Sequence, residues 1–460
     1  MSGVHRDTLL RWLREGRIRE PGRDRNNWRV FTKQETDAVV KFAKGEAFAT
    51  LSTIAEQQAP YIVTAPYSHV IRKLTELDWN FTDANTGFLT HSIHPYPAKF
   101  IPQIPNTLIQ ELSSVGETVF DPFCGSGTTL VEALRLGRHA IGLDANPLSC
   151  LISRAKTARI EEIEMQLLCT LADEIERCGQ QTTIASLPLF PELTIVNKAK
   201  RPSFDGVKDW FDEHVINELA FIKEKCLSLT NEKARQLALV AFSSIIVTVS
   251  RQDSDTRYVR RDKNIQPGDT YLRFSRALRD ATHRAIEFSS EVDNKWQAQI
   301  FEANILDQPE TGKVDLVVCS PPYPNAYSYH LYHRTRMLWL EMDQPTFKKV
   351  EIGSHRKYSQ KGSNGATAET FKQELAVILS WLARLLYPNR YACFVIGDSI
   401  LKGKTIENDQ LLIEVARENG FVLEANITRN LQATKKYFNP AIGKIRDEHI
   451  VILRNTRGSE

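Results

Sequence analysis

The sequence has 460 residues, of which 42% are hydrophobic and 25% are charged, so a collagen-like, low-complexity or wholly disordered chain is excluded. At about 150 residues per domain, this length suggests roughly three domains. The formal net charge is only +3, but residues 1–45 hold 11 Lys and Arg against 6 Asp and Glu. A short basic head on a nearly neutral body is typical of contact with a polyanion, and a solvated arm is the alternative.

No segment of the sequence predicts a membrane or secretory protein. The longest strongly apolar stretch without a charge, residues 237–249, has 13 residues and is shorter than the ~20 that a spanning helix needs. Residues 1–25 contain many charged residues but no apolar run, so no secretory signal is expected. The seven Cys show no CxxC spacing, which favours reduced thiols and no structural zinc. We therefore expect a cytoplasmic protein without a membrane partner.

Residues 1–48 are expected to form a small DNA-binding head. Leu9 and Trp12 lie at helical spacing on one face of a predicted helix. Arg6 and Arg11 lie on its other faces and are therefore candidate DNA contacts.

A hairpin and a second helix are expected to follow. Residues 23–27 are a polar turn, and residues 28–31 are an extended run, as in a wing. Thr32 with Glu35 three residues later is a capping box, which opens a helix. A helix, a wing and a helix together are typical of DNA-reading domains. The segments RDTLLRW and NNWRVF, within residues 6–31, resemble the recognition helix and the wing of MerR-type winged helix-turn-helix domains.

From residue 117 the sequence alternates between strand-like and helix-like segments. Residues 118–120 are an apolar run, a glycine-rich loop and an amphipathic segment follow, and a second apolar run ends at Asp144. This order makes a βαβ unit, the start of a doubly wound parallel sheet. The alternation returns with strands expected at 314–318, 391–396 and 449–453 and helices at 371–386 and 409–419. The predicted fold class is therefore α/β.

A helical insert is expected to interrupt this sheet. Residues 151–295 contain helix-like segments at 209–227, 233–249 and 272–288, with a charged loop at 251–263. The catalytic domain is accordingly assigned to 90–150 and 296–456, with 151–295 as the candidate target-recognition region. Residues 91–105 hold four Pro, so an ordered arm without helix is expected there.

The loop DPFCGSGTT, residues 121–129, is a candidate ligand-binding loop. Gly125 and Gly127 let the backbone approach a ligand, and the helix that follows favours negative charge at its start. Asp144 comes 17 residues after Gly127, at the end of the next strand, where its carboxylate can accept hydrogen bonds from ribose hydroxyls. The loop lacks the third Gly of a dinucleotide fingerprint and the Lys of a phosphate loop, so an adenosine without phosphates fits better than a nicotinamide cofactor. A purely structural glycine turn is the alternative.

The strand expected at 314–318 is followed by the tetrapeptide Ser320-Pro321-Pro322-Tyr323. The two prolines end the strand and leave Ser320 and Tyr323 at its carboxyl end, where open α/β sheets bind ligands. Ser320 and the adjacent backbone carbonyls offer hydrogen-bond acceptors, and Tyr323 offers a flat aromatic face. An exocyclic amine held there is oriented for attack on an electrophile. A proline-terminated strand with a core tyrosine is the alternative.

The pair DPFCGSGTT and SPPY resembles the motif pair of amino-methylating DNA methyltransferases that use S-adenosylmethionine. The resemblance implies a Rossmann-like methyltransferase sheet, with Ser320, Pro321, Pro322 and Tyr323 as the catalytic residues. In the implied reaction a nucleotide is flipped from the duplex, its base stacks on Tyr323, and Ser320 hydrogen-bonds its amine. SPPY is associated with methylation of cytosine N4 in DNA, whereas DPPY and NPPY are usual for adenine N6. No metal or covalent intermediate is implied.

The same resemblance assigns a site for S-adenosylmethionine. Asp144 would hold the ribose, and Asp307, at the end of a strand expected over 301–306, would approach the adenine. The segment HPYPAKF, residues 94–100, resembles the family's cofactor-covering motif. The cofactor-binding residues assigned in this way are Pro95, Ala98, Lys99, Phe100, Asp121, Phe123, Gly125, Gly127, Thr128, Asp144 and Asp307.

Candidate DNA contacts outside the head lie in the charged segment 251–263 and after SPPY. The segment mixes Arg, Gln and Asp, which read base edges and phosphates, and a solvated loop is the alternative. His330 and His333 lack an evident third ligand, so no metal site is expected. The candidate DNA-binding residues are Arg251, Arg257, Arg260, Arg261 and Arg334, and Tyr327, Tyr329, His330, His333 and Arg336 are also expected to line the DNA cleft. The implied partners are double-stranded DNA and a cognate restriction endonuclease or other defence-system subunit.

Three other functions stay open on the sequence alone. Adenine-N6 methylation is one, because Ser320 alone distinguishes the tetrapeptides and because many SPPY enzymes place SPPY before the cofactor motif. The others are an RNA amino-methyltransferase and a transcriptional regulator whose enzyme fold senses a ligand. Cytosine-C5 methylation is excluded, because its nucleophilic Cys follows a Pro, whereas Cys319 precedes Ser320-Pro321.

Overall fold

The computed structural model contains two compact units, residues 1–65 and 66–460. In the first, β1 (Gly22–Arg23) pairs antiparallel with β2 (Arg29–Val30), so a hairpin stands where the wing is expected. Arg6 and Arg11 lie outside the described residues, and the winged helix-turn-helix stays a prediction. The residues that the structure describes are 22–23, 29–30, 33, 36, 68–99, 101–185, 199–255, 257–325, 327–359, 365–401, 403–430 and 447–457.

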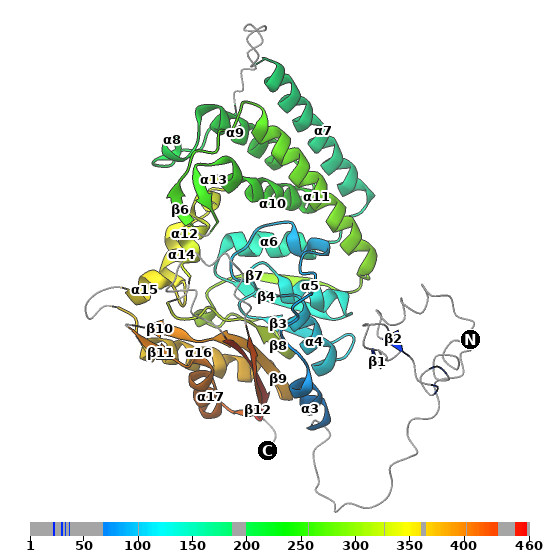
Figure 1. Ribbon diagram of the computed structural model, residues 1–460, viewed down its shortest axis with the longest axis vertical. Helices are drawn as coiled ribbons and strands as arrows, with labels where there is room; N and C mark the ends of the chain where they lie inside the picture. Colours follow the sequence, from blue (N-terminus) through cyan, green and yellow to red (C-terminus); the bar gives the residue numbers. More distant parts are fainter. Residues whose placement is uncertain are drawn as a thin grey trace, which may run out of the picture. The chain divides into compact units, whose positions relative to one another are not determined.

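The second unit is built on a seven-stranded sheet with the order β12-β13-β9-β8-β3-β4-β7 (Figure 1). The strands β7, β4, β3, β8 and β9 run parallel, and β13 is inserted antiparallel between β9 and β12. This topology confirms the predicted α/β class and the Rossmann-like methyltransferase sheet. The strand bounds are β3 (Thr118–Asp121), β4 (His139–Asp144), β7 (Ala298–Glu302), β8 (Val314–Cys319), β9 (Leu386–Gly397), β12 (Phe421–Asn430) and β13 (Asp447–Asn455).

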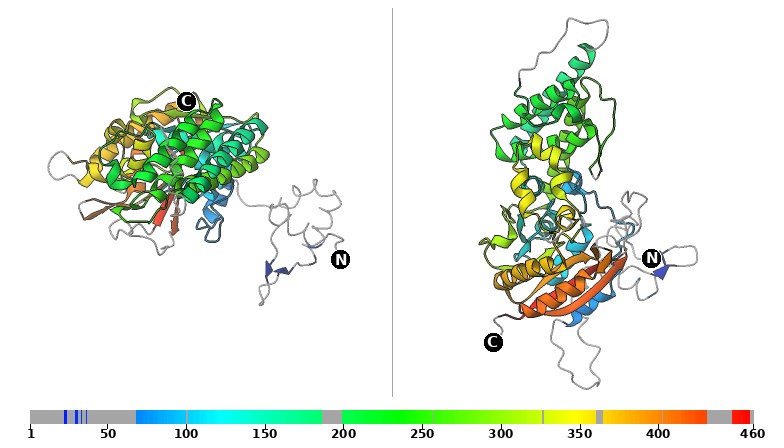
Figure 2. Two further views of the ribbon diagram at one scale, coloured as in Figure 1. Left: turned by 90° about the horizontal axis from the view of Figure 1, so that it is seen from above. Right: turned by 90° about the vertical axis from the view of Figure 1, so that its left-hand side faces the viewer.

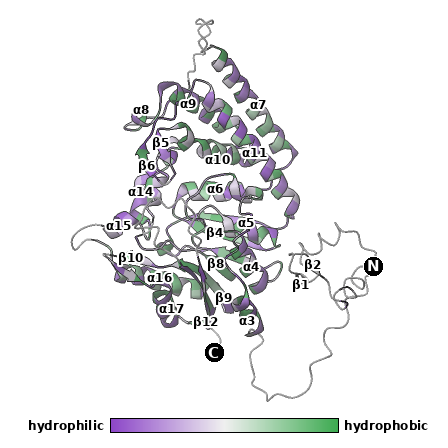
Figure 3. Cartoon of the chain, viewed as in Figure 1, coloured by the Kyte–Doolittle hydropathy of each residue, from purple (hydrophilic) through white to green (hydrophobic). Residues whose placement is uncertain are grey.

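Helices cover both faces of this sheet. Because side chains alternate along a strand, Phe120 and Val317 pack on one face with α16 and α17, while Val119 and Val318 pack on the other with α4 and α5. Strands buried on both faces have continuous apolar runs, as residues 316–319 of β8 and 391–396 of β9 do. The green colouring of this part of the sheet in Figure 3 follows these runs. The helices nearest the sheet are α3 (Ser68–Glu76), η1 (Leu89–Ser92), α4 (Gln103–Leu112), α5 (Thr128–Arg135), α6 (Pro147–Thr157), η2 (Ile305–Asp307), α16 (Ala368–Leu385) and α17 (Asn408–Glu418).

A helical insert connects β4 to β7 and lies at one end of the second unit, away from β9 and β12 (Figures 1 and 2). Its long helices share a core in which α11 packs along α7 and α10. The expected boundary at residue 151 falls inside α6, which packs on β4 and β7 and also on α10 of the insert. The insert contains α7 (Glu162–Ala185), α8 (Val207–Trp210), α9 (Glu213–Leu227), α10 (Glu232–Val249), the strands β5 (Gln252–Ser254) and β6 (Arg257–Arg260), and α11 (Asp269–Glu291).

Several elements differ from the prediction. Residues 91–105 are expected to lack helix, but α4 begins at Gln103. The helix tolerates Pro105 because this residue lies in the first turn, where a backbone N–H has no hydrogen-bond partner within the helix. The strand expected over 301–306 ends at Glu302, and η2 follows. The strand β12 and the helix α7 are additions to the predicted elements. The remaining short elements are α12 (Tyr329–Tyr332), α13 (Arg334–Trp339), α14 (Gln344–Val350), α15 (His355–Ser359), β10 (Ser399–Leu401) and β11 (Lys404–Ile406).

Among the described residues, none of the helices has the length and apolar character needed to cross a bilayer.

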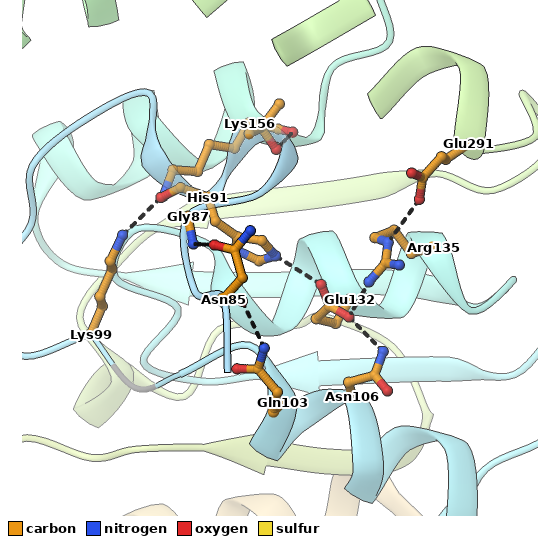
Figure 4. Close-up of polar contacts among 11 residues, drawn as sticks. Asn85, Gly87, His91, Lys99, Gln103, Asn106, Glu132, Arg135, Lys156 and Glu291 are labelled. Carbon is orange, nitrogen blue, oxygen red and sulfur yellow. Dashed lines mark hydrogen bonds and ion pairs between the residues drawn. The ribbon is translucent and has the colours of Figure 1, made fainter. Parts of the chain in front are cut away.

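A buried cluster of hydrogen bonds around Glu132 fixes the arm before α4 onto α5 (Figure 4). His91 Nε2 lies 2.7 Å from Glu132 Oε1, and both side chains are almost fully buried. Asn106 Nδ2 and Arg135 Nη1 donate to the other oxygen, Glu132 Oε2, at 2.6 and 2.7 Å. Burial lowers the pKa of His91, against the opposing influence of Glu132. Glu132 thereby joins the arm, α4 and α5.

Replacing Glu132 by Ala should therefore destabilise the fold by about 3 kcal/mol, because it leaves buried donors without an acceptor. The matched control is Glu291→Ala, since Glu291 is half exposed and pairs with the same Arg135 at 3.1 Å; it should cost less than about 1 kcal/mol. Urea unfolding of both variants measures the difference. Equal losses would show that the Glu132 cluster does not hold the arm.

Candidate active site

The glycine-rich loop between β3 and α5 is fixed by close backbone packing. Gly127 has φ +79°, and a Cβ there would lie 2.9 Å from Ser153 Oγ and 3.2 Å from Ser153 Cα, so only glycine fits. Asp121 Oδ1 accepts a hydrogen bond from the Phe123 N–H at 3.0 Å. Burial raises the pKa of Asp121 to about 7. Gly127 and Asp121 therefore shape the loop.

Asp144 connects this loop to the end of β4. Its Oδ2 accepts from the Gly125 N–H at 2.9 Å, and its Oδ1 accepts from the Asn146 N–H at 2.8 Å. Burial raises the pKa of Asp144 to about 6, although these two hydrogen bonds act in the opposite direction. The carboxylate thus holds Gly125, whose φ is +48°, in place.

A cavity opens at the carboxyl edge of the sheet, next to the turns that follow β3, β4 and β8. It holds about 840 Å³ of empty space, open solvent at its mouth included. The predicted site residues that line it are Ala98, Lys99, Phe123, Gly125, Thr128, Asp144, Ser320 and Pro322. The cofactor assignment missed the other lining residues, which are Tyr96, Pro122, Cys124, Ser126, Leu143, Ala145, Asn146, Asn304, Ile305, Tyr329, Phe347, Val350, Glu351 and Ile352.

Some predicted site residues do not line this cavity. Asp307 lies in η2 and borders a neighbouring hollow. Because β7 ends at Glu302, four residues earlier than expected, the side chains of Asn304 and Ile305 reach the cavity in its place. Phe100 lies outside the described residues. The others that do not line the cavity are Pro95, Asp121, Gly127, Pro321 and Tyr323.

The arm before α4 brings Tyr96 and Lys99 to the cavity. Lys99 Nζ donates to the His91 carbonyl at 2.8 Å, and Lys156 Nζ donates to the same oxygen at 3.2 Å (Figure 4). Burial lowers the pKa of Lys99. Tyr96 Oη lies 2.7 Å from Ser149 Oγ, which fixes its ring at the cavity wall. The expected covering motif therefore reaches the cavity through these two side chains and Ala98.

The catalytic tetrapeptide follows β8 directly. Ser320 and Pro322 line the cavity. The Tyr323 hydroxyl points instead toward β9 and β13, where it lies 3.3 Å from the Val395 carbonyl and 3.2 Å from Glu448 Oε1. Stacking of a base on the Tyr323 ring stays a prediction.

Residues 350–356 form a segment, here called the strap, that packs against the backbone of the tetrapeptide. Gly353 has φ +72°, and a Cβ there would lie 2.8 Å from the Tyr323 carbonyl oxygen and 3.0 Å from that of Pro322. Ser354 Oγ lies 3.1 Å from Ser328 Oγ, which ties the strap to the loop after SPPY.

Glu351 strengthens this connection. One of its carboxylate oxygens accepts from the Tyr329 N–H, and the other pairs with His330 Nδ1. No sequence motif marks the strap, because its role depends on one glycine and on polar contacts across more than twenty residues.

The charged segment 251–263 contains a hairpin, and its arginines are bound by aspartates. Its strands β5 and β6 pair antiparallel. The four arginine side chains remain 37% to 72% exposed, so they can still reach a partner in solvent. Their ion pairs are Arg251 with Asp212, Arg257 with Asp253, Arg260 with Asp209 and Arg261 with Asp253.

Part of the segment after SPPY is buried, contrary to expectation. Arg336 is 1% exposed, forms an ion pair with Asp255 and donates from Nε to the Ser243 carbonyl at 3.0 Å. His333 is also buried, with its ring 4.9 Å from that of Tyr96, and burial lowers its pKa to about 3. Arg336 faces the insert and His333 faces the arm, while the buried His330 pairs with Glu351 of the strap, so these side chains are not exposed at a DNA cleft. Arg334 is exposed.

Comparison with known proteins agrees with the geometry of this site. Residues 21–154 match the family N6_N4_Mtase, described as DNA methylase. The type II methyltransferase M.MvaI of Kocuria varians is 30% identical over 280 residues, which are 57% of this chain and 60% of that protein. M.MjaII of Methanocaldococcus jannaschii is 23% identical over 449 residues, 79% of this chain and 82% of that protein. M.BsoBI of Geobacillus stearothermophilus is 23% identical, and the match covers 64% of this chain and 62% of that protein.

Residues 21–154 are therefore similar to the N6/N4 DNA methylases. The match covers less than two thirds of the length of M.MvaI and of M.BsoBI. The cofactor that this relationship implies is S-adenosylmethionine.

The strap predicts a difference between two glycines. Gly353→Ala combines left-handed strain with a clash against the SPPY carbonyls and should destabilise the fold by about 3 kcal/mol. Gly312→Ala is the matched control, because Gly312 has φ +86° and nothing within 4 Å of its Cβ position; it should cost about 1 kcal/mol. Urea unfolding measures both variants. A Gly353→Ala loss no larger than the control would show that the strap does not press on the tetrapeptide.

Proposed function

We propose that the chain is a DNA methyltransferase that moves the methyl group of S-adenosylmethionine to the exocyclic N4 amine of cytosine. The observation that carries this proposal is that Ser320 shares one cavity with Gly125 and Asp144. A donor bound against the glycine loop would therefore lie beside an amine bound at Ser320. The Ser of SPPY favours cytosine N4 over adenine N6.

The lining of the cavity suits S-adenosylmethionine. Asp144 presents carboxylate oxygens for ribose hydroxyls, and Lys99 offers a positive charge to the carboxylate of the methionine part. Ser126 Oγ and Asn146 Nδ2 are buried polar atoms of this lining, and neither has a hydrogen-bond partner among the described residues. Apolar side chains such as Ile305 provide a surface for the adenine. The bound cofactor supplies a methyl group on a positively charged sulfur.

The chain's own residues contribute mainly by positioning. Ser320 Oγ and the backbone carbonyl beside it would accept hydrogen bonds from the amine and turn its lone pair toward the methyl group. Correct alignment of two reactants alone lowers a barrier substantially. The strap and the two prolines restrict movement of these acceptors. A base can reach them only if it is flipped out of the duplex.

Contacts with double-stranded DNA are assigned to the basic head and to the exposed arginines. Arg251, Arg257, Arg260 and Arg261 extend from or beside the hairpin of the insert, and Arg334 lies in α13. If the four arginines of the insert released their aspartate partners, they could contact phosphates instead. Phosphate and sugar contacts make up most of the hydrogen bonds in protein–DNA interfaces. A restriction endonuclease that cuts the same unmethylated sequence is the proposed functional partner.

The decisive test is the identity of the methylated nucleoside. The protein is incubated with labelled S-adenosylmethionine and unmethylated duplex DNA, which is then digested to nucleosides and examined by mass spectrometry. We expect N4-methyl-deoxycytidine. A methylated adenine would overturn the base assignment, and the absence of label in DNA would overturn the enzyme assignment.

Ser320→Ala is the matched variant for this test. It removes one hydrogen-bond acceptor and should lower kcat by about 100-fold or more, by analogy with the loss of one preorganised polar group in other enzymes. Binding of S-adenosylhomocysteine, measured by calorimetry, should stay within about threefold, because Asp144 and Lys99 still hold it. A variant with wild-type kcat would remove Ser320 from the reaction.

A further inference from the structure

A chain of polar groups leads from the cavity to the far side of β9. Ser320 Oγ lies 3.5 Å from Tyr323 Oη, and Tyr323 Oη lies 3.2 Å from Glu448 Oε1 on β13. Ser320 and Glu448 are distant in sequence but joined by one side chain. Nothing in the proposed function requires this connection.

The chemistry of Glu448 sets the direction of the hydrogen bonds. The Tyr323 hydroxyl has one proton and two acceptors within reach, Glu448 Oε1 at 3.2 Å and the Val395 carbonyl at 3.3 Å. An ionised carboxylate is the stronger acceptor of the two, so Tyr323 donates its proton to Glu448. The tyrosine oxygen is then free to accept the Ser320 hydroxyl proton. Ser320 Oγ consequently presents its lone pairs, and not its proton, to the cavity.

Glu448 has a cationic partner and access to water. Its second oxygen, Oε2, lies 3.2 Å from Arg429 Nη1, the residue directly opposite on β12. His449 and Tyr323 are the other titratable groups that influence it. Burial raises the pKa of Glu448, although Arg429 and the Tyr323 hydroxyl act against this. The Glu448 side chain is 16% exposed, so a proton can leave it to solvent.

Methylation of an amine requires a group that accepts a proton. The new bond joins the amine nitrogen to the methyl carbon, and the electrons of the broken carbon–sulfur bond remain on sulfur. The nitrogen then carries one hydrogen too many and a positive charge until that proton is removed. A serine hydroxyl cannot keep the proton by itself, so it must pass a proton on.

We propose that Glu448 receives, through Tyr323 and Ser320, the proton that the methylated amine releases. Ser320 Oγ takes the proton from nitrogen as its own hydroxyl proton moves to Tyr323 Oη, and the tyrosine proton moves to Glu448 Oε1. Glu448 ends as a carboxylic acid, the two hydroxyls are restored, and the acid loses its proton to solvent. The inference rests on the proposed function, because it needs an amine at Ser320.

Two carboxylates, those of Asp144 and Glu351, line the cavity itself, but both already accept hydrogen bonds from other groups. Asp144 accepts from the N–H groups of Gly125 and Asn146. Glu351 accepts from the Tyr329 N–H and pairs with His330. No hydrogen bond found among the described residues joins either of them to Ser320, whereas Tyr323 does join Ser320 to Glu448.

The test uses the full chain with Glu448→Gln and Tyr323→Phe. In Glu448→Gln the new amide can still accept the tyrosine hydrogen bond but cannot take up a proton, so kcat should fall about 10- to 100-fold. Tyr323→Phe keeps the aromatic ring and should give a similar loss. The double variant should be no slower than the slower single variant, because the two substitutions interrupt the same proton path. S-adenosylhomocysteine binding should be unchanged in all three.

Glu424→Gln is the matched control. Glu424 forms the same kind of cross-strand pair with Arg454 between β12 and β13, but its carboxylate is far along the strands from Tyr323. It should keep the wild-type kcat.

The pH profile adds a second readout. The kcat of the wild type should rise with pH as Glu448 ionises, and this rise should be absent in Glu448→Gln.

The outcomes separate the inference from the proposed function. Wild-type kcat in Glu448→Gln, or equal losses in Glu448→Gln and Glu424→Gln, would overturn the relay while leaving the methyltransferase intact. Absence of methyl transfer by the wild type would overturn the proposed function. Infrared difference spectra of the ligand-free protein test the coupling without activity, because loss of the tyrosine donor in Tyr323→Phe should raise the titration midpoint of the Glu448 carboxyl band. An unchanged midpoint would also overturn the relay.

Discussion

The parallel pairing of β3 with both β4 and β8 is the constraint on which the site depends. Parallel neighbours end at the same edge of a sheet, so the turns after these strands must open side by side. The glycine loop, Asp144 and the SPPY tetrapeptide come from three separate parts of the sequence, yet the pairing leaves them around one cavity. A donor bound at the glycine loop and an amine bound at Ser320 could react only because of this proximity.

Buried carboxylates hold the segments that surround this edge. Glu132 fixes the arm that carries Lys99, Glu351 connects the strap to the loop after SPPY, and Asp144 orders the glycine loop. In each case both oxygens are engaged, and at least one of them accepts from, or pairs with, a group of another segment. Removal of such a group leaves buried donors unsatisfied, which costs more than the hydrogen bonds themselves contribute. Polar contacts thus determine how the loops sit on an otherwise apolar fold.

The parts of the site that are predictable from sequence are those with local signals. The strand before Asp121, the glycines after it and the prolines after Ser320 each impose a conformation on their own neighbours, and the structure places them as expected. The missing parts depend on contacts between distant residues. Gly353 and Glu448 belong to no motif and act only because other segments fold against them.

Errors in the prediction have similar causes. The strand expected before Asp307 ends at Glu302, so Asp307 lies in η2 and borders the neighbouring hollow, and its contact with the adenine stays a prediction. The charge of Arg336 suggests exposure at a DNA cleft, but a single partner, Asp255, stabilises it in the core. Charged side chains are mostly exposed, but a buried one is stable where the chain supplies a counter-ion and a hydrogen-bond acceptor, here Asp255 and the Ser243 carbonyl.

The central claim is that the methyl donor and the reacting amine share the cavity at the carboxyl edge of the sheet. A crystal structure of the protein with S-adenosylhomocysteine tests it most directly. We expect the ribose hydroxyls within hydrogen-bond distance of Asp144 and the sulfur on the side of the cavity that faces Ser320. A ligand bound outside the walls formed by the glycine loop and the tetrapeptide, or with its sulfur turned away from Ser320, would contradict the account.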